Sequence, residues 1–120
     1  MRGLENTEYL TVIEDAPRKR QPNHPILFRG ETDRVYINAA GIYEIVDPGL
    51  ARRIRIQTAG AQSAVVWNPW VEKSKRLADF GDDEWPSMVC VETGNIAGNA
   101  LRIPAGTTHR SQTVISLATL

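Results

Sequence analysis

The stretch VVWNPWVEKSKRLADFGDDEWPSMVCVET, Val65 to Thr93, decides the fold of this chain. An apolar run, Ala64 to Trp67, leads into a polar middle, and a second apolar run, Met88 to Val91, ends in the carboxylate of Glu92. This pattern predicts a strand, a short helix and a second strand. A charged side chain at the end of an apolar strand is either exposed to solvent there or retained for a function, so Glu92 is the first candidate functional residue.

The polar middle of this stretch carries the signals of a short surface helix. Asn68 suits the N-cap position, and Pro69 suits the first helical position because its missing N–H would have no partner there. Gly81 suits the left-handed position that follows a helix. The sequence therefore predicts one short helix inside Trp70 to Phe80.

Most of the remaining chain consists of short segments rich in strand-forming residues. Turn signals such as Asp47-Pro48-Gly49 separate them, because Pro presets φ and Gly accepts a positive φ. Together with the two apolar runs, they predict about eight strands in a single domain, residues 1–120, with an all-β fold: an antiparallel β-sandwich with one short helix. The segments are Glu8–Ile13, Ile26–Arg29, Arg34–Asn38, Ile42–Val46, Arg52–Gln57, Ala100–Ile103 and Thr107–Leu117.

The charge balance bears on the class of partner. The 120 residues include 14 basic and 14 acidic side chains, so the formal net charge is +0. This balance argues against nucleic acid or a membrane surface as the main partner, since both reward a concentrated basic patch. The basic run Arg18-Lys19-Arg20 stands in a proline-rich segment, residues 16–25, which lacks periodicity and is predicted to be a solvated loop.

The chain has one cysteine and two isolated histidines, which limits the chemistry that it can perform. Cys90 has no second cysteine with which to form a disulfide or a metal cluster, and its valine neighbours predict a buried, inert thiol. His24 and His109 lack partners at ligand spacing, so no metal site is predicted and structural roles explain both more readily. No phosphate-binding glycine loop is present, and no cofactor is expected. Without a signal-peptide pattern or a run of about 18 apolar residues, the sequence predicts a cytoplasmic protein.

Two further residue groups have both a structural and a functional interpretation. The acidic run Asp82-Asp83-Glu84 is more often a solvated turn than a cation site. Tryptophan faces suit the C–H surfaces of sugars, although core packing is the more frequent role in a small β protein. The tryptophans concerned are Trp67, Trp70 and Trp85.

Four segments, in one order and spacing, carry a resemblance to a known family. They are Thr32–Tyr36, Val66–Pro69, Ala78–Asp83 and Met88–Glu92. The sequence resembles the D-hexose-6-phosphate mutarotases, also called glucose-6-phosphate 1-epimerases, of the aldose 1-epimerase superfamily. The resemblance extends from Gly3 to Ser116. It implies part of a galactose-mutarotase-like β-supersandwich, acting on the anomeric carbon of a phosphorylated hexose such as glucose 6-phosphate.

The resemblance also implies roles for two carboxylates. Glu92 matches the general base of the family, which takes the proton from the anomeric hydroxyl while a histidine protonates the ring oxygen. The ring then opens, C1 turns about the C1–C2 bond, and closure gives the other anomer. Asp33 matches a substrate-binding aspartate that contacts sugar hydroxyls. Arg34, its neighbour, is interpreted equally well as a surface charge or as a partner for Asp33.

The chain matches only the C-terminal half of such an enzyme. The N-terminal half of the family carries the catalytic histidine and the phosphate-binding arginines, and neither His24 nor His109 lies in a motif that would replace them. Exposed strand edges and an uncovered apolar face then predict self-association, or a separate N-terminal half as partner. The alternative hypotheses are a non-catalytic carbohydrate-binding or interaction module derived from a mutarotase, and a fragment without function.

Overall fold

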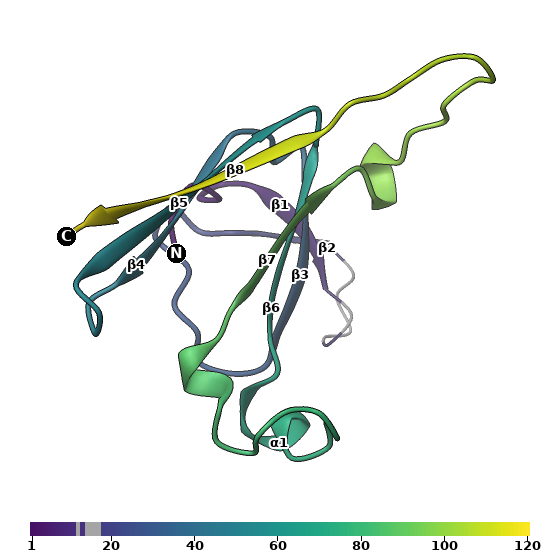
Figure 1. Ribbon diagram of the computed structural model, residues 1–120. Helices are drawn as coiled ribbons and strands as arrows, with labels where there is room; N and C mark the ends of the chain where they lie inside the picture. Colours follow the sequence, from purple (N-terminus) through teal and green to yellow (C-terminus); the bar gives the residue numbers. More distant parts are fainter. Residues whose placement is uncertain (12, 14–17) are drawn as a thin grey trace.

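The computed structural model describes residues 1–11, 13 and 18–120, which form two layers of antiparallel strands (Figure 1). The larger layer is a sheet of five strands in the order β2-β1-β3-β6-β7, and the smaller one has the order β4-β5-β8. The strands of the larger sheet are β1 (Glu8–Thr11), β2 (Arg18–Arg20), β3 (Thr32–Ile37), β6 (Ser63–Asn68) and β7 (Cys90–Gly94). Those of the smaller sheet are β4 (Ile42–Asp47), β5 (Arg52–Ala59) and β8 (Gln112–Thr119). The predicted all-β, antiparallel sandwich is confirmed.

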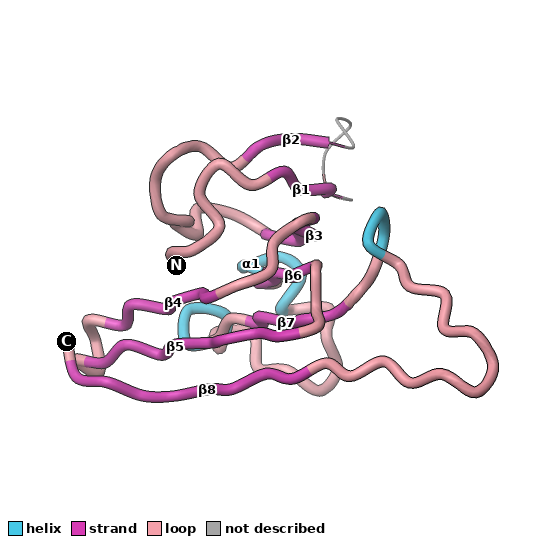
Figure 2. Tube along the Cα trace, turned by 90° about the horizontal axis from the view of Figure 1, so that it is seen from above, coloured by secondary structure: helices cyan, strands magenta, loops and turns pink. Residues whose placement is uncertain are grey.

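The core lies between the inner faces of the two sheets. In Figure 2, the strands β4, β5 and β8 lie to the lower left of β1, β2 and β3. Tyr36 stands opposite Tyr9 on one side and Ala64 on the other, so these three side chains share the inner face of the larger sheet. Tyr43 and Ile56 are paired on the inner face of the smaller sheet. All five are buried, and they belong to one continuous hydrophobic cluster. Alternation along each strand therefore sends one set of side chains into this core and the other set to the outer face.

The helix is shorter than predicted. Helix α1 spans Trp70–Ser74, and the N–H groups of Arg76 and Leu77 then donate to carbonyl oxygens only three residues back. Such bonds tighten and end the helix well before Gly81, whose φ is not in the left-handed region. The helix also begins one residue later than predicted: its N-cap is Pro69 rather than Asn68, although the Asn68 side chain accepts a hydrogen bond of 2.9 Å from the Trp70 N–H.

One predicted loop segment is a strand instead. Arg18–Arg20 forms β2 and pairs with β1, where Arg18 Nε lies 2.8 Å from Glu8 Oε1. Its charged side chains suit an edge strand, because they discourage pairing with a further chain. The prediction of a loop was wrong because the partner strand lies ten residues earlier, beyond the reach of local turn signals. β1 itself ends at Thr11, and the rest of the predicted strand includes residue 12, outside the described residues.

The structure has loops in two segments that were predicted to be strands, Ile26–Arg29 and Ala100–Ile103. Ile26 is buried in the core and its N–H donates to the Met1 carbonyl, so its apolar character reflects packing rather than sheet pairing. Ala100–Ile103 lies in an exposed segment that precedes β8, and the last strand begins only at Gln112 rather than at Thr107. Within the described part of the chain, no helix is long and apolar enough to cross a membrane.

Candidate functional site

The strand register places Asp33 and Glu92 on the same face of the five-stranded sheet. Asp33 of β3 stands opposite Trp67 of β6, and Glu92 of β7 stands opposite Val65, two residues earlier on the same strand. Residues that are paired, or that lie two apart along a strand, point to one face. Val66, between Val65 and Trp67, belongs to the buried core. Asp33 and Glu92 therefore share the outer face, with β6 between them.

Their separation follows from the same register. Two strand spacings of about 4.8 Å and two residue steps of about 3.3 Å put the two Cα atoms roughly 12 Å apart. The diagonal crosses β6 between Val65 and Trp67. Two carboxylates that point from these positions to the same side can contact opposite edges of one small ligand lying on the strand between them.

Trp67 and Lys73 line this face beside Asp33. Trp67 is half-buried, and the Lys73 Nζ atom lies 5.8 Å from the centre of its ring. Lys73 comes from α1, which follows β6 directly, and its ammonium group also pairs with Glu31 Oε1 at 3.0 Å. An aromatic face and a cation therefore stand next to the aspartate. Lys73 was not predicted from the sequence, because nothing marked it except its position about one helical turn after the end of an apolar strand.

The other two tryptophans pack against each other away from the strands. The ring centres of Trp70 and Trp85 lie 4.2 Å apart, with an angle of 49° between the rings. Both are half-buried, so the expected core role is only partly fulfilled. The Asn68 side-chain amide donates to the carbonyl oxygens of Trp85 and Met88, at 2.8 and 2.9 Å. This amide fixes the turn that leads into β7.

The opposite end of the outer face is covered by a 3-10 turn, Ala97–Asn99. The buried Ser63 hydroxyl donates to the Ile96 carbonyl and to Asn99 Oδ1, both at 3.1 Å. Ser63 shares its face with Val65, two residues on, so this turn lies over the strand end beyond Glu92. The open part of the face therefore lies between this turn and the start of α1.

Neither carboxylate is committed to an internal contact. Glu92 is exposed and Asp33 is half-buried, and neither forms a hydrogen bond or an ion pair with another described residue. An unpaired carboxylate at an accessible position can accept a proton or a hydroxyl hydrogen bond from a ligand. Among residues 1–11, 13 and 18–120, no group of three or more potential ligands could hold a metal ion.

Cys90 lies next to Glu92 on the outer face, two residues earlier on β7. The thiol is half-buried, not fully buried as predicted, because β7 is the last strand of its sheet. Burial, and then the negative charge of Glu92, raise the pKa of Cys90 above its usual value. The thiol is therefore protonated at neutral pH, as expected for an inert cysteine.

The two histidines form contacts elsewhere. His24 Nδ1 lies 3.0 Å from the Pro25 carbonyl oxygen, and His109 Nε2 lies 2.8 Å from that of Gly60. Because a carbonyl can only accept, each of these ring nitrogens is a donor. His109 also contacts the Asn95 amide, so it attaches the segment before β8 to the end of β7. Neither imidazole contacts Asp33 or Glu92.

Arg34 is not a partner of Asp33. It lies on the opposite, inner face, where its guanidinium stands 4.8 Å above the centre of the Tyr9 ring and donates to Gln21 Oε1 at 3.2 Å. The Tyr36 hydroxyl donates to the same oxygen at 3.1 Å. Burial raises the pKa of Tyr36, while the Arg34 side chain opposes this shift. Alternation along β3 separates the aspartate and the arginine although they are neighbours in sequence.

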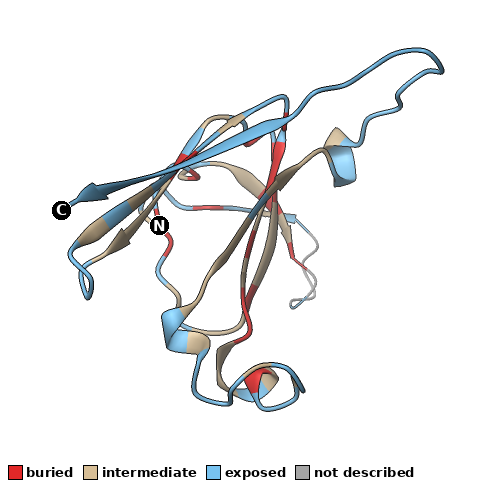
Figure 3. Ribbon diagram, in the orientation of Figure 1, coloured by how far each residue is buried: buried red, intermediate tan, exposed pale blue. Residues whose placement is uncertain are grey.

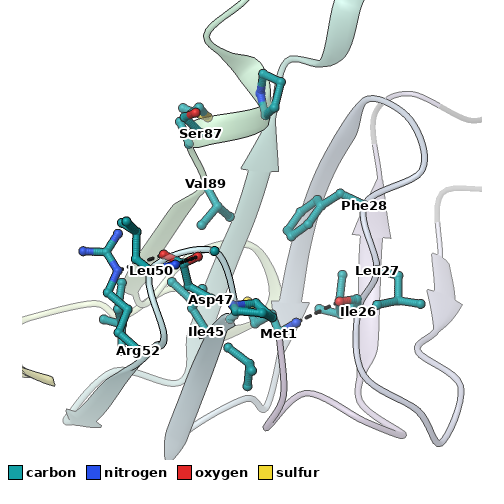
Figure 4. A pocket seen from close by; sticks show the side chains of 16 residues that line it. Met1, Ile26, Leu27, Phe28, Ile45, Asp47, Leu50, Arg52, Ser87 and Val89 are labelled. Carbon is teal, nitrogen blue, oxygen red and sulfur yellow. Dashed lines mark hydrogen bonds and ion pairs between the residues drawn. The ribbon is translucent and has the colours of Figure 1, made fainter. Parts of the chain in front are cut away.

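A cavity of about 800 Å³ opens between the two layers, on the side of the sheet opposite to Asp33 and Glu92 (Figure 4). Its walls are largely aliphatic and include Ile45 and Ile54 of the smaller sheet. At its rim, Arg52 Nε donates to Asp47 Oδ2 at 2.8 Å, and this hydrogen bond lowers the pKa of Asp47. Neither Asp33 nor Glu92 lines this cavity or the smaller one beside His24. The two carboxylates therefore lie on an open sheet face and not in a cavity.

Comparison with known proteins identifies the family of this chain. Residues 1–116 match the family described as aldose 1-epimerase. The chain belongs to the aldose 1-epimerase family. The search of solved structures found no match.

Several curated proteins that carry the name "Putative glucose-6-phosphate 1-epimerase" are similar to part of this chain. One from Cenchrus ciliaris is 38% identical over 90 residues, which is 75% of this chain and 27% of the relative. One from Escherichia coli strain K12 is 38% identical over 85 residues, or 71% of this chain and 29% of the relative. One from Haemophilus influenzae is 25% identical over 96 residues, 80% of this chain and 33% of the relative. The chain thus spans about a third or less of these relatives.

Proposed function

We propose that this chain supplies the base-bearing part of a hexose-6-phosphate mutarotase, which interconverts the α and β anomers of glucose 6-phosphate. The observation that carries the proposal is the shared outer face of Asp33 and Glu92, two unpaired carboxylates on either side of β6. The similarity to proteins named glucose-6-phosphate 1-epimerases supports the choice of substrate.

In the proposed reaction, Glu92 accepts the proton of the anomeric hydroxyl. The electron pair of that O–H bond forms the carbonyl at C1 as the bond from C1 to the ring oxygen breaks, and an acid protonates the ring oxygen. Rotation about C1–C2 and the reverse steps then give the other anomer. Asp33 accepts hydrogen bonds from sugar hydroxyls, and Trp67 presents its ring to the C–H face of the sugar.

A companion polypeptide supplies the acid and the phosphate-binding groups in this proposal. His24 and His109 are each hydrogen-bonded to a backbone carbonyl and do not contact the outer face carboxylates. Lys73 is the cation found beside Trp67, and it is already paired with Glu31. The relatives hold more than two thirds of their length outside the matched part, which is room for these groups.

The test is the rate at which pure α-glucose 6-phosphate equilibrates, followed by NMR above the spontaneous rate. The chain alone, the unmatched segment of the Escherichia coli relative alone, and their mixture are compared. We expect little excess rate from either part and a clear one from the mixture, because a positioned acid or base contributes about 10² to 10⁴ each. Glu92→Gln should abolish the gain, whereas Glu72→Gln, at an exposed helix position paired with Lys75, should not. A mixture no faster than its parts would reject the proposal.

A second candidate is a carbohydrate-binding module without catalysis. The half-buried Trp67 ring opposite the unpaired Asp33 favours it, because sugar recognition by one aromatic face and one carboxylate needs no acid. Binding of glucose 6-phosphate by the chain alone, lost on Trp67→Ala and kept on Glu92→Gln, with no rate gain in the mixture, would support this candidate.

A further inference from the structure

Strand β8 is an unusually open edge of the smaller sheet. Among the described strands, only β5 pairs with it, in continuous register from Arg52–Thr119 to Ala59–Gln112. All of its residues are exposed, and Figure 3 shows the strand in pale blue along its length. In an antiparallel strand, alternate residues direct their N–H and C=O groups away from the neighbour. The far side of β8 therefore offers a row of backbone groups to another strand.

The composition of β8 lacks the features that discourage such pairing. Its sequence, QTVISLAT, contains no charged residue, no proline and no glycine. The opposite edge of the same sheet, β4, contains Glu44 and Asp47, and the edge strand β2 of the other sheet is Arg-Lys-Arg. Natural edge strands are usually protected by charge, proline or a bulge. The fourth edge strand, β7, contains Glu92, so among the described edge strands β8 alone has no charged residue.

The order of residues in β8 is nearly symmetric about Ser116. Read in either direction from this serine, an aliphatic residue is followed by a smaller apolar one and then by threonine. If a second copy is placed antiparallel, with a two-fold axis at Ser116, residues of the same class therefore lie opposite each other. The facing pairs would be Ser116 with Ser116, Ile115 with Leu117, Val114 with Ala118 and Thr113 with Thr119.

This register also keeps the two faces of the sheet distinct. Ile115 and Leu117 pair with Ile56 and Ile54 on β5, so both lie on the inner face, yet they are 66% and 68% exposed. In the antiparallel pair, Ile115 of each copy would lie beside Leu117 of the other. Such cross-strand apolar pairs are the unit of sheet stabilisation, and they would form one continuous strip across both copies.

We propose that β8 is a dimerisation edge, which pairs antiparallel with β8 of a second copy of this chain with Ser116 on the two-fold axis. A closed two-fold contact of this kind uses the same surface on both copies, as most homodimers do. A strand of the companion polypeptide is the competing occupant. The near-symmetric sequence of β8 favours the second copy, because a strand of a different polypeptide could pair with β8 without any such symmetry. The inference is independent of sugar chemistry and therefore of the proposed function.

Cysteine cross-linking tests the register directly, in a Cys90→Ala background that removes the natural thiol. Facing residues of antiparallel strands have Cα atoms about 4.5 to 5.5 Å apart, which is within the range of a disulfide. Ser116→Cys should therefore give a disulfide-linked dimer under a copper-phenanthroline oxidant. Val114→Cys and Ala118→Cys are matched controls: each alone should cross-link poorly, while a mixture of the two should cross-link well. Equal cross-linking of all three single variants would overturn the register.

Sedimentation across a concentration series tests the dimer itself. We expect the mass to rise from one chain to two, and Leu117→Lys should raise the dissociation constant at least about tenfold, because each copy would lose one apolar contact. Leu50→Lys is the control, since Leu50 is 65% exposed and lies in the turn between β4 and β5. Circular dichroism establishes that both variants are folded.

Three outcomes would overturn the proposal. The chain could remain a monomer at all concentrations, or Leu50→Lys could weaken the dimer as much as Leu117→Lys does. The chain could also be a monomer that binds the companion polypeptide, with Leu117→Lys abolishing that binding. The last result would assign β8 to the companion rather than to a second copy.

Discussion

The Tyr36 hydroxyl and the Gln21 side-chain oxygen, 15 residues apart in sequence, are joined by a buried hydrogen bond of 3.1 Å. Gln21 follows the end of β2, and Tyr36 lies near the centre of β3, so this bond attaches the loop after β2 to the core. Tyr36 is fully buried and Gln21 is 2% exposed. The bond is therefore shielded from competition with water.

Tyr36→Phe tests the contribution of this bond to stability. The substitution keeps the ring and removes the donor, so we expect the free energy of unfolding to fall by about 0.5 to 1.5 kcal/mol. Tyr9→Phe is the matched control, because the Tyr9 hydroxyl has no hydrogen-bond partner among the described residues. Urea denaturation of the three proteins measures the difference. A Tyr36→Phe loss no greater than that of Tyr9→Phe would contradict the assigned role.

Asn68→Asp separates the two functions of the Asn68 side chain. The carboxylate can still accept the Trp70 N–H, but it cannot donate to the carbonyl oxygens of Trp85 and Met88. Leaving these two part-buried acceptors without a donor should cost about 2 to 6 kcal/mol of unfolding free energy at neutral pH, at about 1 to 3 kcal/mol for each group. Thermal or urea unfolding measures the loss. An Asp variant as stable as the parent would show that only the bond accepted from the Trp70 N–H matters.

The same residue shows which features the sequence could predict. Its bond to the Trp70 N–H depends on a donor only two residues away, and local pattern indicated a side-chain acceptor here, although the N-cap itself is Pro69. Its bonds to Trp85 and Met88 depend on how the chain returns to form β7, which no local pattern specifies. The early end of α1 has a related cause, because a short helix depends more on packing than on propensity. Strands such as the one predicted at Arg52–Gln57 were found because the alternation of charged and apolar residues is visible within a few residues of sequence.

The candidate site illustrates the same limit. The motifs identified Glu92 and Asp33, but their common face depends on the register of β3, β6 and β7, which are far apart in sequence. Arg34 could be either a partner of Asp33 or a separate charge, and only the pleat of β3 decides that it faces Tyr9 and Gln21. The basic strand β2 was missed because its composition resembles that of a solvated loop.

The reactivity of Cys90 should report the charge on Glu92. Burial raises the pKa of the thiol, and the neighbouring carboxylate raises it further, so Cys90 should alkylate with iodoacetamide more slowly than a free cysteine at pH 8. Glu92→Gln removes the charge but not the burial. We expect the pKa to fall part of the way towards its usual value, and the alkylation rate at a given pH to increase.

The pH dependence of stability has a defined sign at this thiol. Because the pKa is raised in the folded state, the unfolded chain loses its proton first as pH rises through about 8.5. The stabilising contribution is therefore complete below that pH and decreases as pH rises through the folded pKa. Glu92→Gln should reduce this decrease. An alkylation profile identical in parent and variant would place Glu92 too far from Cys90 to act on it.

The final prediction distinguishes the roles of the two carboxylates in the reconstituted mutarotase. If Glu92 takes the anomeric proton, Glu92→Gln should lower kcat by about 10² to 10⁴, since an amide cannot accept that proton. If Asp33 holds hydroxyl groups equally in the ground and transition states, Asp33→Asn should mainly raise KM. The expected increase is about 10- to 160-fold, for loss of a charge-assisted hydrogen bond of about 1.5 to 3 kcal/mol. Saturation kinetics of anomer exchange by NMR separates the two parameters, and Glu72→Gln serves as the control. A kcat loss on Asp33→Asn as large as that on Glu92→Gln would assign the base to Asp33, or to both residues acting as a unit.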